Sequence, residues 1–266
     1  MKSQIKGLLN AALGRFDLRI EGHSRLLSLE GLVHSLEQYD KDIIAAISSL
    51  PRGKLATLGS LLPMSHSQIW QDLFVLTELD FKKNGYYVEF GATNGVDLSN
   101  TYLLEKSFGW NGILAEPAKY WHDALKANRT CSIETNCVWR DSTSVLNFNE
   151  VQIPELSTIT SFRKTDLHAS RRNHADSYSV NTISLNDLLD KYGAPREIDY
   201  LSIDTEGSEF EILNNCDFAK YSFKVITCEH NFSPIREKIL SLLTRHGYIR
   251  KFIGLSKWDD WYTKSR

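Results

Sequence analysis

Cysteine is scarce in this chain of 266 residues, and no two of its four cysteines form a Cys-x-x-Cys pair. This spacing argues against a zinc ribbon and against a thioredoxin-type site. A chain of this length buries about 70–75 % of the surface that its unfolded form exposes, so it needs neither disulfides nor a structural metal to fold. We therefore expect free thiols in a reducing compartment at Cys131, Cys137, Cys216 and Cys228.

An excess of charge of either sign is also missing. The 31 basic and 33 acidic side chains give a formal net charge of −2, so no overall positive field attracts nucleic acid. No stretch reaches the roughly 20 apolar residues that a membrane span needs. The N-terminus has no apolar segment followed by a small-residue cleavage site. These absences predict a cytoplasmic protein without a nucleic-acid partner.

Residues 1–20 have apolar side chains at helical spacing, with basic residues between them. A basic amphipathic helix either lies on an anionic membrane or packs against its own domain, and the sequence leaves both open. A second helical pattern runs from Asp42 to Leu50 and stops at a proline. We expect a helical N-terminal extension over residues 1–66 and one main domain over residues 67–266.

In the main domain, β-rich runs alternate with helical patterns. This alternation predicts an α/β fold with a mostly parallel sheet and helices on both faces. Such sheets bind ligands at the carboxyl ends of their strands. We predict strands at Tyr86–Phe90, Gly112–Glu116, Ser132–Val138, Ile198–Asp204, Phe223–Cys228 and Tyr248–Phe252. We predict helices at Gln68–Leu79, Asn100–Phe108, Tyr120–Lys126, Leu185–Tyr192, Glu209–Leu213 and Ile235–His246.

The turn after the first strand contains Glu89, Gly91 and Gly95. Gly91 lets the backbone approach a ligand, and Gly95 permits a tight turn. The helix that follows offers free N–H groups to a carboxylate or a phosphate. Only two glycines are present, so the pattern is not the GxGxxG of dinucleotide-binding folds. It suits a ligand with an amino-acid end, whose ammonium group Glu89 would face; a plain turn between strand and helix is the alternative.

Acidic residues also follow the next two strands. Glu116 ends the second strand, where nucleotide-binding α/β folds place a carboxylate on the ribose hydroxyl groups. Asp141 follows the third strand and would accept a hydrogen bond from an adenine amino group. A solvated loop aspartate is an equally good interpretation of Asp141.

Further motifs are Ser67-Gln68, Ser99-Asn100-Thr101, Leu104-Glu105-Lys106, Gly109-Trp110 and Ile198-Asp199-Tyr200-Leu201-Ser202-Ile203-Asp204-x-Glu206-Gly207-x-Glu209. With the Gly91 turn and Glu116-Pro117, they resemble the FkbM family of S-adenosylmethionine-dependent methyltransferases, over residues 67–262. The resemblance implies a Rossmann-like methyltransferase fold with a late antiparallel strand. It also implies O-methylation of sugars or of natural products such as macrolides. The S-adenosylmethionine site would include Glu89, Gly91, Asn94, Gly95, Asn100, Glu116, Asp141 and Asp204.

A second acidic group lies at two later strand ends. Strand alternation puts Asp204 and Glu206 on one side of the chain, and the strand Phe223–Cys228 runs into Glu229 and His230. The resemblance places these strand ends beside the first strand, so the four side chains would border the sulfonium group of the cofactor. Capping of a helix start by Glu206 and a plain turn role for His230 are the structural alternatives.

Methyl transfer to a sugar hydroxyl requires in-line positioning and removal of a proton. A histidine suits the base role near neutral pH, so we predict His230 as the base, with Asp204 and Glu206 as its catalytic partners. Alternatively, Asp204 and Glu229, joined by Glu206 or His230, would hold Mg²⁺ or Mn²⁺ and lower the pKa of the hydroxyl group. The sequence does not separate a base from a metal ligand.

The segment Ile153–Val180 has few apolar runs and several basic residues. Its length and its place between strands favour a lid or a substrate loop, and a solvated loop is the alternative. Its cations would contact an anionic acceptor, such as one with a phosphate group. The candidate substrate-binding residues are Arg163, His168, Arg171 and Arg172.

The leading hypothesis is an S-adenosylmethionine-dependent O-methyltransferase that modifies a sugar hydroxyl of a nucleotide sugar or glycan, in polysaccharide biosynthesis. One alternative is an O-methyltransferase of a non-carbohydrate natural product. Another is an inactive methyltransferase fold that serves as a binding module, although intact Gly91, Gly95, Glu116 and Asp204 argue against this. Peripheral membrane contact through residues 1–20 and assembly into a homo-oligomer stay open.

Overall fold

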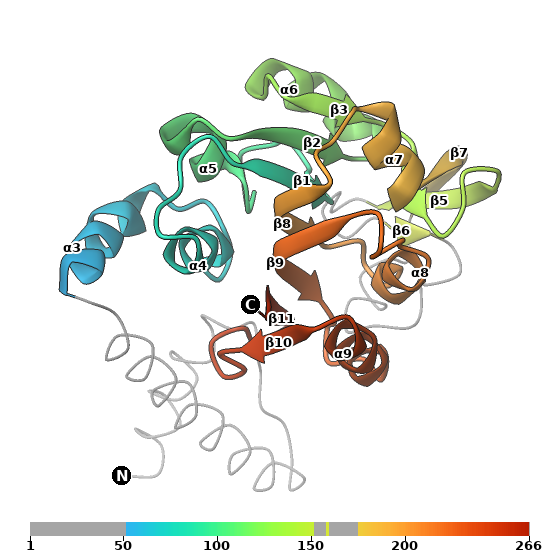
Figure 1. Ribbon diagram of the computed structural model, residues 1–266. Coiled ribbons are helices and arrows are strands. Elements are labelled where there is room, and N and C mark those ends of the chain that lie inside the picture. The colour runs from blue at the N-terminus through green and yellow to red at the C-terminus, as the bar shows by residue number, and fades with distance from the viewer. Residues whose placement is uncertain (1–51, 152–157, 160–174, 266) are drawn as a thin grey trace, which may run out of the picture.

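The computed structural model describes residues 52–151, 158–159 and 175–265 (Figure 1). Most of the expected N-terminal extension, with its amphipathic residues 1–20, lies outside the described residues. Its described part contains the helix α3 (Arg52–Leu61) and the 3-10 turn η1 (Leu62–Met64). Within the described ranges, no helix combines the length and the apolar character that crossing a membrane requires.

Seven strands form the main sheet, in the order β10-β11-β9-β8-β1-β2-β3. They are β1 (Tyr86–Phe90), β2 (Asn111–Ala115), β3 (Ser132–Glu134), β8 (Glu197–Ile203), β9 (Ser222–Glu229), β10 (Tyr248–Lys251) and β11 (Asp259–Lys264). β11 pairs antiparallel with both β9 and β10, and the other pairs are parallel. The predicted α/β fold, with its late antiparallel strand, is confirmed.

Helices cover both faces of this sheet (Figure 1). One face carries α4 (Gln71–Glu78), α5 (Tyr102–Phe108) and, after the 3-10 turn η2 (Lys119–Trp121), α6 (His122–Asn128). The other carries α7 (Leu185–Lys191), α8 (Glu209–Asn214) and α9 (Ile235–Arg245). Each face has its own apolar core, and strand alternation sends Tyr87 into one and Val88 into the other. The β1 strand is therefore buried on both sides.

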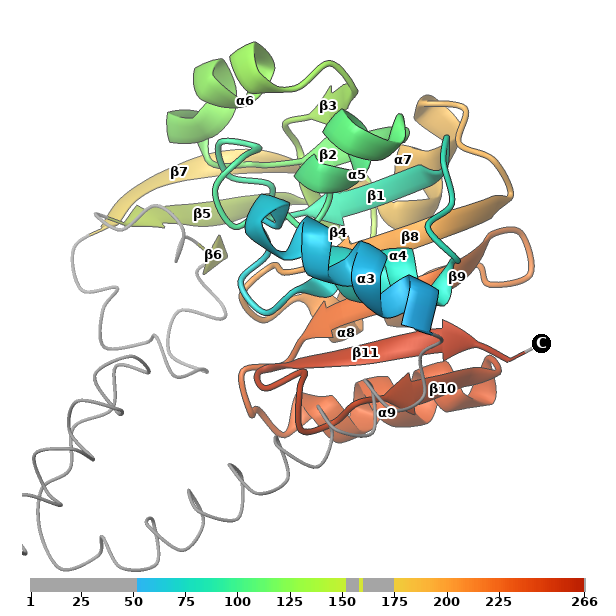
Figure 2. The same cartoon turned by 90° about the vertical axis from the view of Figure 1, so that its left-hand side faces the viewer.

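A second sheet, with the order β4-β7-β5-β6, lies to one side of the main sheet (Figure 2). Its strands are β4 (Cys137–Trp139), β5 (Val145–Val151), β6 (Thr158–Ile159) and β7 (Ala175–Ser184). The single strand predicted at Ser132–Val138 is therefore wrong. Glu134 accepts hydrogen bonds of 2.9 Å from the backbone N–H groups of Thr135 and Asn136, and this turn leads the chain out of the main sheet.

The loop predicted over Ile153–Val180 is also wrong at its end, where β7 begins at Ala175. Tyr178 of this strand contacts the segment after β2. Its hydroxyl accepts a hydrogen bond of 3.0 Å from the Lys119 N–H and donates one of 3.4 Å to the Pro117 carbonyl. The second sheet thus supports the loop that follows Glu116.

Candidate functional site

The carboxyl ends of β1, β2, β8 and β9 lie at one edge of the main sheet, because these strands are parallel neighbours. At this edge β1 turns at Gly91, whose φ is +76°. A Cβ atom on Gly91 would lie 2.1 Å from the carbonyl oxygen of Asp204. Glycine alone permits this contact, so Gly91 brings the first turn against the end of β8.

Glu89 holds the loop that follows this turn. Its buried carboxylate accepts hydrogen bonds from the Asn100 N–H (2.7 Å), the Ser99 hydroxyl (3.0 Å) and the Thr101 hydroxyl. Burial raises the pKa of Glu89, and the charge of Arg129 and these bonds oppose the rise. Both oxygens have donors from the loop, so Glu89 holds this loop in place. The contact between Glu89 and an ammonium group stays a prediction.

The other predicted residues of this loop differ in their hydrogen bonds. The Asn94 amide oxygen accepts from the backbone N–H groups two and three residues later, both at 2.9 Å, so this side chain shapes the turn at Gly95. Asn100 donates to the Ser202 hydroxyl at 3.0 Å, but its own Oδ1 is buried without a hydrogen-bond partner. An unpaired buried acceptor is costly. Asn100 Oδ1 is therefore suited to a donor group of a ligand.

Glu116 follows β2 and is buried. One of its oxygens accepts from the Thr93 N–H and the other from the Ala118 N–H, both at 2.8 Å. These bonds tie the first turn to the second strand end. Glu116 therefore lies where the sequence predicts a ribose contact, at the carboxyl edge of the sheet.

Asp141 is predicted to follow the third strand of the main sheet. In the structure it follows β4, which belongs to the second sheet. Its carboxylate accepts hydrogen bonds from the Ser144 hydroxyl (3.0 Å) and from the N–H groups of Thr143 (3.0 Å) and Ser144 (2.9 Å). These bonds hold the pKa of Asp141 below its usual value. The expected position is wrong, and the structure supports a turn role rather than a contact with adenine.

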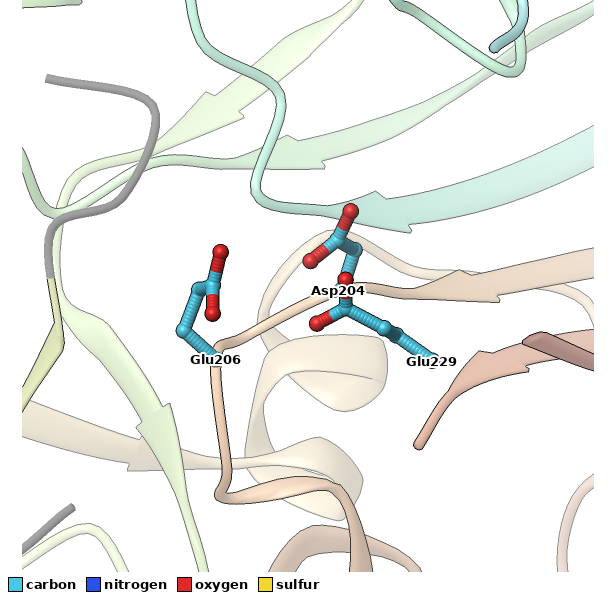
Figure 3. A group of neighbouring side chains, drawn as sticks. All are labelled: Asp204, Glu206 and Glu229. Carbon is cyan, nitrogen blue, oxygen red and sulfur yellow. The ribbon is translucent and has the colours of Figure 1, made fainter. Parts of the chain in front are cut away.

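Asp204, Glu206 and Glu229 form one carboxylate cluster at the ends of β8 and β9. One oxygen of each lies within 4.8 Å of the others, and Figure 3 shows the three side chains converging. Glu206 has a positive φ of +57°, a backbone conformation that costs energy outside glycine. Glu209 stabilises this turn by accepting from the backbone N–H groups of Thr205 (3.1 Å) and Gly207 (3.0 Å).

Burial dominates the electrostatics of this cluster. It raises the pKa of Asp204 and that of Glu229, where the neighbouring carboxylates add to the rise. Asp259, which faces Glu229 across the β11–β9 pair, has its pKa raised to about 8, first by burial. Its carboxylate accepts a hydrogen bond of 2.8 Å from Gln71. Asp259 is not among the residues predicted from the sequence, where its one signal is an acidic pair directly before Trp261.

His230 is buried, and both of its ring nitrogens are engaged. Nδ1 accepts from the Phe232 N–H at 2.9 Å, so the ring proton lies on Nε2, which donates to the Asp259 carbonyl at 3.0 Å. Burial lowers the pKa of His230 to about 4. The structure contradicts the prediction that His230 is the base, and the same bonds exclude it as a metal ligand.

A cleft of about 300 Å³ opens beside the carboxylate cluster. Its lining includes Gly207, Glu209, Glu229, His230, Asn231, Ser233, Pro234 and Ile235. The cleft is the candidate site for an acceptor. The predicted acceptor contacts Arg163, His168, Arg171 and Arg172 lie outside the described residues.

The parallel sheet, the glycine turn after β1 and the acidic residue after β2 define a methyltransferase of the Rossmann-like class. Within this class, the chain belongs to the FkbM family, because the Methyltransferase FkbM domain matches residues 89–250, more than half of its length. The family resemblance predicted from the sequence is confirmed.

Two solved structures are similar to the chain at low identity. Precorrin-6y C5,15-methyltransferase from Geobacter metallireducens is 11 % identical over 68 % of this chain and 71 % of that chain, with a TM-score of 0.39. Methyltransferase FkbM from Methylobacillus flagellatus is 13 % identical over 69 % of this chain and 44 % of that chain, with a TM-score of 0.42. Among curated proteins, none matches the sequence.

Proposed function

We propose that this methyltransferase uses S-adenosylmethionine to methylate a hydroxyl group of a sugar, in a nucleotide sugar or a glycan. The observation that carries the proposal is the convergence of Asp204, Glu206 and Glu229 within 4.8 Å of one another. A hydroxyl group must lose its proton as its oxygen takes the methyl group. A carboxylate with a raised pKa is suited to accept that proton near neutral pH.

The residues around the first turn fit S-adenosylmethionine. Asn100 Oδ1 is a buried acceptor without a partner and would accept from the ammonium group. Glu116 would hold the ribose hydroxyl groups from the end of β2. When bound, S-adenosylmethionine supplies a methyl group on a positively charged sulfur. The carboxylate cluster beside the turn would favour that positive charge.

We assign Asp204 as the proton acceptor. Burial raises its pKa, and the backbone contact with Gly91 fixes its position relative to the first turn. Glu209 holds the turn that carries both Asp204 and Glu206. Asp204 therefore takes the role that the sequence analysis gave to His230.

The same cluster also fits a hard divalent cation. Mg²⁺ and Mn²⁺ prefer carboxylate oxygens, and the spacing of Asp204, Glu206 and Glu229 suits a shared ion. These three residues would hold the ion, which would lower the pKa of the acceptor hydroxyl. The base and the ion predict opposite responses to chelation.

A transfer assay tests the proposal. The chain is incubated with methyl-labelled S-adenosylmethionine and a panel of nucleotide sugars, with macrolide alcohols as a second panel, and products are measured by mass spectrometry. Nucleotide sugars come first because Arg163, Arg171 and Arg172 favour an anionic acceptor. We expect label on a sugar oxygen. Full activity in EDTA supports the base, and loss that Mg²⁺ or Mn²⁺ restores supports the ion.

Two other outcomes contradict the proposal. Label only on macrolide alcohols would support a natural-product methyltransferase. The second outcome is that calorimetry detects no binding of S-adenosylmethionine, which would support an inactive methyltransferase fold that serves as a binding module.

A further inference from the structure

Arg129 is the only lysine or arginine among the described residues that is buried. It follows α6, and its side chain has 0 % exposure to solvent. Its Nε donates to a carboxylate oxygen of Glu105 at 2.8 Å. Burying a guanidinium group is costly unless it is both paired and fully hydrogen-bonded. The contacts of the other two nitrogens therefore show what this buried charge holds in place.

Both terminal nitrogens of Arg129 bind the loop between β1 and α5, and one of them also binds β1. Nη1 donates to the Gly95 carbonyl (2.9 Å) and to the Ser99 hydroxyl (3.1 Å). Nη2 donates to the hydroxyls of Thr101 (2.9 Å) and Tyr87 (2.9 Å). One planar group thus joins the middle of the loop, its far end and β1.

This loop needs such a clamp because its backbone is strained. Thr93 and Leu98 have positive φ values of +47° and +61°, and outside glycine such conformations persist only where the surroundings hold them. Glu89 holds only the far end of the loop, through Ser99, Asn100 and Thr101, as described above. Glu116 and Asn128 bind the middle of the loop, at the Thr93 N–H and the Asn94 carbonyl, both through single hydrogen bonds. Arg129 is the side chain that binds both the middle of the loop and its far end.

We propose that Arg129 is the positioning residue for the cofactor: it holds residues 91–101, and Asn100 with them, in the conformation that binds S-adenosylmethionine. The proposal rests on the proposed use of this cofactor. Arg129 acts through Gly95, Ser99 and Thr101 and does not itself touch the cofactor. A lysine cannot replace it, because a single ammonium group lacks the planar fork that reaches both Gly95 and Tyr87.

The test compares Arg129→Lys and Arg129→Gln with the control Lys82→Gln, which breaks an ion pair of 2.7 Å with the buried Asp199. Affinity for S-adenosylmethionine is measured by calorimetry at a temperature where circular dichroism shows each variant folded. We expect both Arg129 variants to raise the Kd about tenfold or more. The control should lower the Tm and leave the Kd unchanged, because the folded fraction keeps its binding loop.

Hydrogen exchange of residues 91–101, measured without ligand, gives a second readout. We expect faster exchange in this loop for both Arg129 variants and not for Lys82→Gln. An unchanged Kd in folded Arg129→Lys would overturn the proposal. Loss of folding in both Arg129 variants would also overturn it, since Arg129 would then serve the stability of the whole fold. A wild-type chain that binds no S-adenosylmethionine contradicts the proposed function instead, while the exchange data still show whether Arg129 orders the loop.

Discussion

Two groups of carboxylates, one around Arg129 and one at the ends of β8 and β9, differ in how their charge is balanced. Glu89 and Glu105 surround Arg129; at Glu105, burial is outweighed by the hydrogen bond from Tyr87 and the charge of Arg129, and the pKa falls to about 2. In the cluster of Asp204, Glu206 and Glu229, burial raises the pKa of Asp204 and of Glu229, and no buried lysine or arginine of the described residues lies among them. The positive charge of Arg129 balances the first group. The second group has no buried lysine or arginine of the described residues to balance it.

The largest expected effect tests this difference directly. Asp204→Asn should lower kcat by about 10²–10⁴-fold, because it removes the proton acceptor. Glu105→Gln, in the group around Arg129, should mainly raise the KM for S-adenosylmethionine. Steady-state kinetics with the acceptor found in the transfer assay separates the two. A near-normal kcat in Asp204→Asn would show that the two groups do not differ in this way.

The contact between Gly91 and Asp204 joins the loop that Arg129 holds to the cluster of Asp204, Glu206 and Glu229. Gly91→Ala should destabilise the fold by about 3 kcal/mol or more, because the new Cβ would lie 2.1 Å from the Asp204 carbonyl oxygen. Gly193→Ala is the matched control: its φ is +61°, but no atom lies within 4 Å of the added Cβ, so its cost should be about 1 kcal/mol. Chemical denaturation measures both. Equal losses would mean that the contact contributes nothing beyond backbone strain.

The pH dependence of stability tests whether folding lowers the pKa of His230, in contrast to the raised pKa values of Asp204 and Glu229. Its pKa falls from 6.5 to about 4 on folding, so the unfolded chain binds more protons between these values. The stability that the neutral ring contributes is therefore lost as the pH falls. Between pH 7 and pH 5, the wild-type chain should lose about 2 kcal/mol that His230→Gln does not lose. Denaturation at both pH values measures this, and parallel curves for the two proteins would contradict it.

The smallest expected effect concerns a cation at the carboxylate cluster. The raised pKa values mean that the folded chain favours protonated carboxyls, so stability is lost as the pH rises above the ordinary carboxyl pKa. If Mg²⁺ binds there, it should raise stability by roughly 1 kcal/mol at several times its Kd. The rise should be larger at pH 8 than at pH 5. Thermal unfolding checks this, with Asp204→Asn as the control, and an equal rise in that variant would show that the ion binds elsewhere.

The sequence predicted the parts of the fold whose local signals agree with the tertiary structure. Tyr86–Phe90 has the predicted bounds because a compact apolar run lies between Asn84-Gly85 and Gly91. The convergence of Asp204, Glu206 and Glu229 followed from strand ends that the family resemblance places side by side.

Other elements were hidden because their tertiary partners, not their composition, stabilise them. β11 begins with Asp259 and Asp260, which are poor strand formers, yet both are buried, and Asp260 pairs with Arg236 at 2.7 Å. The role of His230 was also beyond the sequence. Nothing in a histidine's position along the chain shows that a backbone N–H and a carbonyl take both of its nitrogens.

The strand order of the main sheet also bears on how the chain is made. β11 fills the space between β9 and β10, although β10 precedes it in the chain. Until residue 264 has been synthesised, one edge of β9, with its buried aliphatic side chains, has no neighbour. Unpaired strand edges attract other chains, so this edge of β9 is a site of aggregation in the nascent protein over this interval. The interval ends when the whole of β11 pairs with β9, and the Asp259–Glu229 pair of this ladder completes the surroundings of the carboxylate cluster.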